Sequence, residues 1–344
     1  MLRNFLIGMV LIGITLLSFK AIDFKGFISP VHFPKPVYDL ANNPVTKDKF
    51  ELGRSLFYET ALSRDNRISC GSCHIQSSAF TQHGHDISHG IEDKLGNRNS
   101  PPIMNLAWSK SFFWDGGVFN LDLQSITPIT NPVEMDERME NVLKKLRAKP
   151  EYLLRFKKAY GSAEITGTKI FKALSSFMVM CISSQSKYDS VMRKTGVEFS
   201  TAEKAGYAVF RKNCAGCHKE PLFTDHSYRN NGLDHTYNSD SGRVAITLDI
   251  HDRFRFKVPS LRNLTHTAPF MHDGRFTTIG EVLDHYSGGV VSMPNLDPLL
   301  KKQGRLGISL TKTDKVQLIA FLKTLEDKDF LNRSELSEHR SQSR

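Results

Sequence analysis

One five-residue pattern occurs twice in this chain of 344 residues, as CGSCH at residues 70–74 and as CAGCH at residues 214–218. Cys-x-x-Cys-His is the attachment signal for c-type haem: the two thiols bond to the porphyrin, and the following His can ligate the iron. A zinc site and a redox-active dithiol are the alternatives, but no further cysteine pair is available to complete a four-cysteine zinc site. The repeat therefore predicts two c-type haems. The expected attachment and ligand residues are Cys70, Cys73 and His74 for one haem, and Cys214, Cys217 and His218 for the other.

Cysteine usage and chain length agree with this prediction. Of the 5 cysteines, only Cys181 lies outside the two motifs, and we interpret it as a small buried apolar side chain. At about 150 residues per domain, the length suggests two domains. We place one haem domain in residues 23–190 and the other in residues 191–344.

The N-terminus resembles an export signal. Residues 5–19 form a mostly apolar run between Arg3 and Lys20. This run suits the core of a signal peptide better than a membrane span, which needs about 20 residues. No clear Ala-x-Ala cleavage site follows, so residues 1–22 are predicted to be either a signal peptide or an uncleaved N-terminal membrane anchor. Bacteria attach c-type haem outside the cytoplasmic membrane, so we expect a periplasmic location.

The net charge of +10 and the isoelectric point near 9.3 favour acidic partners or anionic lipid surfaces. Nucleic acid is not expected as a partner, because the chain has no stripe of interleaved basic and aromatic residues.

Apolar periodicity predicts a mostly α-helical fold. We expect helices at residues 47–58, 169–183 and 315–325, and the prolines between residues 21 and 45 predict an extended lead-in. Gly53 and Gly206 each precede a Phe by four residues, and a helical Gly that costs about 1 kcal/mol relative to Ala suggests close helix packing. The charged, Ser-rich tail from residue 327 is expected to fray.

Several side chains between the two motifs are suited to haem chemistry. His83, His85 and His89 follow the first motif, and any of them could ligate iron from its second face. Sequence alone does not choose among them. Trp114, one of only 2 tryptophans, is either a core aromatic or an aromatic between two redox centres.

The string Asn131-Pro132-Val133-Glu134 has two compatible interpretations. In the first, Asn131 is the N-cap of a helix and Glu134 completes a capping box. In the second, Glu134 lies over an open haem face as an acid-base catalyst.

Six further strings, with the two motifs in this order, resemble the bacterial dihaem cytochrome c peroxidases of the MauG-containing superfamily. The strings are LSRD at 62–65, RNSP at 98–101, FWDG at 113–116, NPVEM at 131–135, FKVPSLRN at 256–263 and TAPFMHDG at 267–274. The resemblance extends from about residue 52 to residue 325. It implies two cytochrome c-like haem domains packed around a shared interface, with the peroxidatic haem in the N-terminal domain and the electron-accepting haem in the C-terminal domain.

The resemblance also implies an activity and its partners. The substrate would be hydrogen peroxide, and a small exported cytochrome or cupredoxin would donate the electrons. Dimers are common in such proteins, but no stretch of this sequence decides whether this chain forms a homodimer.

Site residues carry over position by position. His89 matches a distal iron ligand that some members displace on activation, Gln124 and Glu134 match the pair that lines the peroxide pocket, and Trp114 matches the aromatic between the haems. Three further positions match residues around a calcium ion between the domains: Asn99, Thr267 and Pro269.

One position departs from the typical peroxidases, in which a Met is the distal ligand of the C-terminal haem. The corresponding residue is Tyr286, as in MauG, which oxidises tryptophans of a partner protein. Met271 is the alternative ligand. A MauG-like oxidase of a protein or quinol is therefore a second hypothesis, and a non-catalytic electron-transfer cytochrome is a third.

Overall fold

The computed structural model describes residues 24–233, 240–302 and 304–339. The segment expected to be a signal peptide or anchor, residues 1–22, lies outside them. Within the described residues, helices dominate and the strands form only two pairs, which confirms the mostly α-helical prediction. No helix in these ranges is long and apolar enough to cross a membrane.

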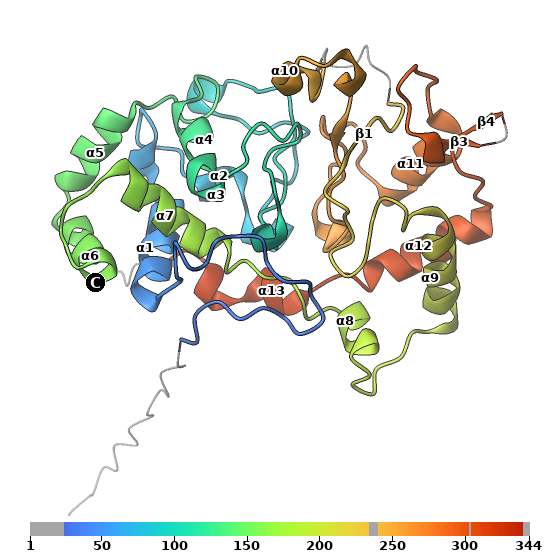
Figure 1. Cartoon of the computed structure of the whole chain (residues 1–344), viewed down its shortest axis with the longest axis horizontal. Coiled ribbons are helices and arrows are strands. Elements are labelled where there is room, and N and C mark those ends of the chain that lie inside the picture. Colours follow the sequence, from blue (N-terminus) through green and yellow to red (C-terminus); the bar gives the residue numbers. More distant parts are fainter. Residues whose placement is uncertain (1–23, 234–239, 303, 340–344) are drawn as a thin grey trace, which may run out of the picture.

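The helices and strands are distributed along the whole described chain (Figure 1). The helices are α1 (Lys47–Phe57), α2 (Cys70–Cys73), α3 (Leu121–Gln124), α4 (Ile126–Thr130), α5 (Met139–Arg147), α6 (Pro150–Tyr160), α7 (Gly167–Met178), α8 (Lys187–Met192), α9 (Thr201–Asn213), α10 (Val244–Thr247), α11 (Ile279–Asp284), α12 (Lys312–Lys323) and α13 (Lys328–Asn332). The strands are β1 (Tyr228–Arg229), β2 (Phe256–Lys257), β3 (Lys301–Lys302) and β4 (Arg305–Leu306). β1 pairs antiparallel with β2, and β3 pairs antiparallel with β4.

Two helix pairs of the same design form the two units seen side by side in Figure 1: α1 packs on α7, and α9 packs on α12. A Cβ atom added to Gly53 would lie 1.9 Å from the backbone oxygen of Ala173, and one added to Gly206 would lie 1.9 Å from the backbone oxygen of Gln317. Only a residue without a Cβ allows either approach, so the expected close packing of both glycines is confirmed. The matching contacts make the two units structural repeats.

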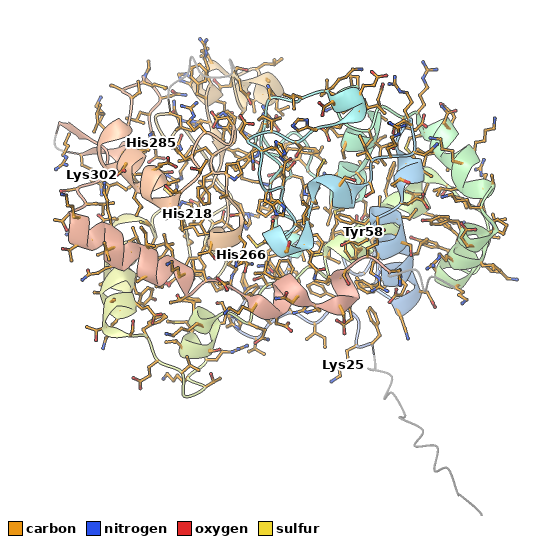
Figure 2. The ribbon with its side chains drawn as sticks, turned by 180° about the vertical axis from the view of Figure 1, so that it is seen from behind. Lys25, Tyr58, His218, His266, His285 and Lys302 are labelled. Carbon is orange, nitrogen blue, oxygen red and sulfur yellow. The ribbon has the colours of Figure 1, made fainter. Side chains whose placement is uncertain are left out.

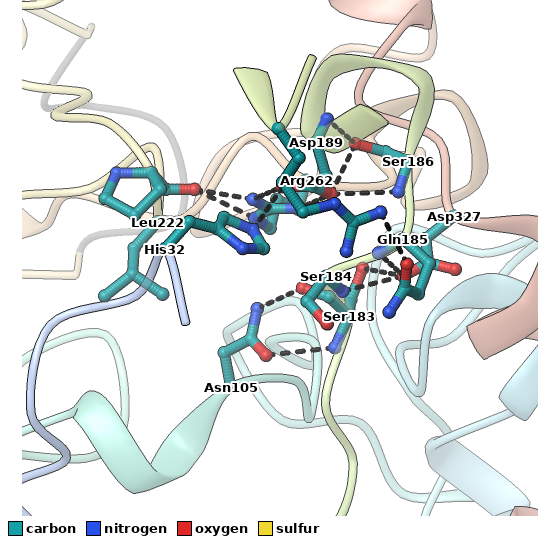
Figure 3. Close-up of polar contacts among 12 residues, drawn as sticks. His32, Asn105, Ser183, Ser184, Gln185, Ser186, Asp189, Leu222, Arg262 and Asp327 are labelled. Carbon is teal, nitrogen blue, oxygen red and sulfur yellow. Dashed lines mark hydrogen bonds and ion pairs between the residues drawn. The ribbon is translucent and has the colours of Figure 1, made fainter. Parts of the chain in front are cut away.

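The helix expected at residues 169–183 ends earlier than predicted, at Met178. The backbone beyond it bonds to side chains from distant segments instead of continuing the helix. The N–H of Ser183 donates to Asn105 Oδ1 at 3.0 Å, and the N–H groups of Ser184 and Gln185 donate to Asp327 Oδ2 at 2.8 Å each. These contacts, visible in Figure 3, hold the non-helical segment that follows α7.

A buried ion pair lies beside that junction (Figure 3). Arg262 is fully buried and donates to both carboxylate oxygens of Asp189, at 2.7 and 2.8 Å. His32 Nε2, from the extended lead-in, lies 2.9 Å from Asp189 Oδ1. The guanidinium also lies over the rings of Phe33 and Phe223, at 4.9 and 5.7 Å. This cluster connects segments that are far apart in the sequence.

The expectation that the chain frays from residue 327 is wrong for the described part of the tail. Phe330 is fully buried in the same core cluster as α1 and α7, and its ring lies 5.7 Å from that of Phe80. The hydroxyl of Tyr58, labelled in Figure 2, donates to the backbone oxygen of Leu336 at 2.8 Å. Three apolar residues of the mostly polar tail pack in this core cluster: Phe330, Leu331 and Leu336. The division of the chain at residue 190 stays a prediction.

Candidate haem sites

The first Cys-x-x-Cys-His motif lines a cavity of about 530 Å³. Its thiols, on Cys70 and Cys73, are not joined in a disulfide. His74 Nδ1 lies 2.7 Å from the backbone oxygen of Phe80, which assigns the proton to Nδ1 and leaves Nε2 as the atom able to ligate iron. Burial lowers the pKa of His74, so its imidazole is neutral, as metal binding requires.

The second motif lines a separate cavity of about 210 Å³, near His218 as labelled in Figure 2. Cys214 and Cys217 are again free thiols. His218 Nδ1 lies 3.1 Å from the backbone oxygens of Phe223 and Pro259, which leaves Nε2 for a metal. In both cavities, two unbridged thiols stand beside an oriented neutral imidazole, so the residues present fit covalently attached haem.

Of the three histidines that follow the first motif, the structure brings only His89 to the first cavity. Its Nδ1 lies 2.5 Å from Asp93 Oδ1, and its backbone oxygen accepts a contact from the Cys73 thiol at 3.9 Å. His83 is instead held by the Ser78 hydroxyl at 2.6 Å. Of the three histidines, His89 is therefore the one placed beside the first motif, and its role as an iron ligand stays a prediction.

Glu134 and Gln124 line the same cavity. Protein surrounds Glu134, but the side chain is exposed toward the cavity interior. Burial raises the pKa of the Glu134 carboxyl above its ordinary value, and a hydrogen bond from Asn131 Nδ2 to Oε1, 2.6 Å long, only partly opposes the shift. A carboxyl in this position can hold a proton and release it close to the first motif.

The helix start predicted at Asn131 is wrong. Helix α4 ends before Asn131, and residues 132–135 form a turn. The backbone oxygen of Asn131 accepts hydrogen bonds from the N–H groups of Glu134 and Asp136, at 3.0 and 2.9 Å. Asp136 has a φ of 48°, which closes the turn and prevents a helix from continuing. The next helix begins only at Met139, so Glu134 is not a capping residue.

Trp114 is buried and lines both cavities. Its indole N–H donates to the backbone oxygen of Asn99 at 2.8 Å, which fixes the ring between the two motifs. The other tryptophan, Trp108, packs in the core cluster of α1 and α7 and lines neither cavity.

Tyr286 and Met271 both line the second cavity, so the structure does not choose between them as a distal ligand. Asn231 lies between the two side chains: its Nδ2 lies 3.6 Å from Met271 Sδ, and its side chain also bonds to the phenol. Burial raises the pKa of Tyr286 to about 12, against the effect of Asn231.

The three residues expected near calcium are gathered around the second cavity: Asn99, Thr267 and Pro269. Of the three, only Asn99 also lines the first cavity. Its amide and carbonyl oxygens are of the type that calcium prefers, and the calcium site stays a prediction.

Two residues that sequence reasoning missed, Lys257 and His226, line the first cavity. Both come from the C-terminal half of the chain. Lys257 lies in the string FKVPSLRN that supported the resemblance, but that string gave no signal for its position between the cavities. Nothing in the sequence marked His226.

A family model described as di-haem cytochrome c peroxidase matches residues 47–196. The methylamine utilization protein MauG of Methylorubrum extorquens is 33% identical over 302 residues, which cover 85% of this chain and 82% of that protein. The chain belongs to the di-haem cytochrome c peroxidase family. Membership makes it a haem oxidoreductase with two haems.

Other members of the family carry different names. Cytochrome c551 peroxidase of Nitrosomonas europaea is 33% identical over 291 residues, which cover 83% of this chain and 82% of that protein. A solved MauG-like protein associated with microbial copper homeostasis is 31% identical, with a TM-score of 0.81, covering 90% of this chain and 98% of that one. Similarity thus shows the family and its fold of two haem units, but it does not separate peroxidase from MauG-type activity.

Proposed function

We propose that this di-haem peroxidase reduces hydrogen peroxide to water at the first cavity, in the N-terminal unit (residues 23–190). The observation that carries the proposal is the Glu134 carboxyl, which has a raised pKa and lines the same cavity as the first motif. A haem held by Cys70, Cys73 and His74 would supply the iron and the redox chemistry.

The chain itself would supply the proton transfer. Reduction of one peroxide molecule to two waters consumes two electrons and two protons. For the O–O bond to break, a proton must also move from one peroxide oxygen to the other, which then leaves as water. Glu134 can accept and return that proton, while the Gln124 amide on the same cavity orients the peroxide by hydrogen bonding. His89, which lines the cavity and contacts Asp93 through Nδ1, would restrict peroxide access until activation.

Electrons would enter through the second unit, which contains the second motif, and reach the first past Trp114, which lines both cavities. The proposed donor is a small exported cytochrome or cupredoxin with an acidic surface, because the chain carries a net charge of +10. We place the reaction in the periplasm, with calcium between the units at Asn99, Thr267 and Pro269.

Replacing the acid-base group tests the proposal directly. In Glu134→Gln, peroxide turnover with a reduced cytochrome donor should fall about 10²–10⁴-fold, because the amide cannot transfer the proton. Both haems should stay attached, as absorbance would show. The control Glu140→Gln makes the same change on an exposed residue of α5 and should keep full turnover. Full turnover in Glu134→Gln would remove Glu134 from the mechanism.

A second candidate function is MauG-like oxidation of a protein or quinol, and Tyr286 on the second cavity favours it. A phenolate ligand would lower the potential of the second haem relative to a Met ligand. This function predicts a long-lived oxidised state after peroxide addition and weak turnover with a cytochrome donor. Peroxidase function predicts rapid return to the resting state when the donor is present. A non-catalytic cytochrome would not react with peroxide.

A further inference from the structure

The cationic side chains around the two cavities differ in their partners. Arg98 lines the first cavity and is paired with Asp115 and Asp240, each at 2.5 Å. Arg229 lines the second cavity and is paired with Asp225 at 2.8 Å and with Asp297 at 2.7 Å. Both guanidinium charges are therefore already balanced by carboxylates of the chain.

Lys257 lies between the cavities without such a partner. Its Nζ donates to the backbone oxygen of Ser111 at 2.8 Å, and no carboxylate of the described residues lies within ion-pair distance of it. Burial lowers the pKa of Lys257 to about 8, against the attraction of Asp115. An ammonium group removed from water in this way is costly unless an anion accompanies it.

His226 adds a second unsatisfied group on the first cavity. Within the described chain its buried Nε2 has no hydrogen-bond partner. The backbone at this residue has a φ of 56°, and its N–H donates to Thr224 Oγ1 at 2.9 Å, which fixes the backbone from which the side chain extends. Burial, with Lys257 nearby, lowers the pKa of His226 to about 4, so the ring is neutral and can donate one hydrogen bond.

We propose that Lys257 and His226 bind the propionate carboxylates of the haem in the first cavity. Both groups are donors that lack an anionic partner, and carboxylates are the anions that a haem brings to its site. Two observations favour the first cavity over the second. His226 lines the first cavity and not the second. The Lys257 ammonium lies 5.9 Å from the ring of Phe112, which also lines the first cavity and not the second. The inference rests on the proposed haem site of the first motif.

This assignment has a structural consequence. The first haem would be attached covalently to the N-terminal unit at Cys70 and Cys73, while its carboxylates would be held by side chains from the C-terminal unit. The Lys257 backbone N–H also donates to the Trp114 backbone oxygen at 2.7 Å, so the same residue would touch the haem and the aromatic between the cavities.

The midpoint potential of the first haem tests the role of Lys257. A cation beside the porphyrin favours the reduced iron, so in a spectroelectrochemical titration of the dihaem protein Lys257→Met should lower this potential more than that of the second haem. Lys257→Arg should keep it near the wild-type value. The control Lys110→Met, which removes an exposed lysine near His226, should cause no comparable shift.

A first-haem potential that is unchanged in Lys257→Met, that falls equally in Lys110→Met, or that changes only at the second haem would overturn the proposal. For His226, the propionate bending bands in resonance Raman spectra should shift in His226→Leu but stay near the wild-type position in His226→Gln, whose amide can donate. Unshifted bands in His226→Leu would exclude this residue. These readouts do not need peroxide turnover, so absence of peroxidase activity would count against the proposed function alone.

Discussion

At the scale of single residues, we propose that access to the first cavity depends on His89, which lines it. Its Nδ1 contacts the carboxylate of Asp93, as in the pairs that orient metal-binding imidazoles. We expect His89 to block peroxide access in the oxidised protein and to move away when the protein receives an electron.

Removing the imidazole should make that activation step unnecessary. In His89→Ala, we expect the fully oxidised protein to react with peroxide at once, because the cavity is already open. Stopped-flow absorbance after mixing with peroxide measures this rate. His83→Ala is the matched control, since His83 bonds to Ser78 and does not line the cavity. An oxidised His89→Ala protein that still needs prior reduction would contradict the blocking role.

Residue spacing predicted the candidate site unevenly. The motif residues and Glu134 could be predicted as cavity residues, because each belongs to a short sequence string that indicates its chemistry. Lys257 and His226 could not be predicted there, because they come from the C-terminal half of the chain and line the cavity of the first motif only once the chain has folded. The capping role predicted for Asn131 failed for a related reason: the positive φ of Asp136 turns the chain where the string alone suited a helix.

At the scale of elements, Gly53 and Gly206 allow the close packing of the helix pair in each unit, α1 on α7 and α9 on α12. A methyl group at Gly53 would collide with the backbone of Ala173, and one at Gly206 with the backbone of Gln317. Backbone cannot move aside as a flexible side chain can. The pattern Gly-x-x-x-Phe was enough to predict these close contacts. The end of α7 was not predictable, because the segment after it is held by Asn105 and Asp327, which come from distant parts of the chain.

Substitution of either glycine should therefore destabilise its unit. Gly53→Ala and Gly206→Ala should each cost about 1–3 kcal/mol of unfolding free energy, as overpacked sites do. Gly280→Ala in α11 is the control, because the added methyl would meet only Thr278 Oγ1 at 3.6 Å. Denaturant titration of the three variants compares them. An unchanged unfolding midpoint for Gly53→Ala would mean that α1 and α7 can separate freely.

At the scale of the whole molecule, buried polar clusters and the C-terminal segment join the two units. Arg262 and Asp189 are both fully buried, and Asp327 binds three residues of the segment that follows α7. The sequence predicted two repeats but not these connections, because a polar, Ser-rich tail gives little sign that Phe330 will be buried in the first unit.

Breaking the ion pair should destabilise the assembled molecule. Arg262→Met leaves the Asp189 carboxylate buried without its guanidinium partner, with only His32 and Ser186 still in contact, and this should cost about 3–5 kcal/mol. Burial alone would raise the pKa of Asp189, but the Arg262 hydrogen bonds and charge lower it to about 2, below the ordinary 3.8. Because the pKa is lower in the folded state, the ionised Asp189 carboxylate stabilises the fold fully above pH 3.8. This stabilisation is lost as the pH falls through about 2 and the carboxylate is protonated.

The difference in thermal stability between wild type and Arg262→Met should therefore be largest above pH 3.8 and should shrink toward pH 2. Thermal unfolding followed by circular dichroism over this range measures it. The double variant Arg262→Met/Asp189→Leu removes both charges and should recover part of the loss. A difference that does not depend on pH would show that Arg262 acts through packing alone.

We propose that peroxide reacts at the first cavity and that the second unit supplies the electrons. The most direct test is a spectroscopic titration of the purified dihaem protein, in which one electron is added before peroxide. We expect the first haem to begin low-spin, to become high-spin on half-reduction, and to turn over peroxide only from that point. A first haem that stays low-spin after half-reduction while peroxide is still consumed would contradict this claim.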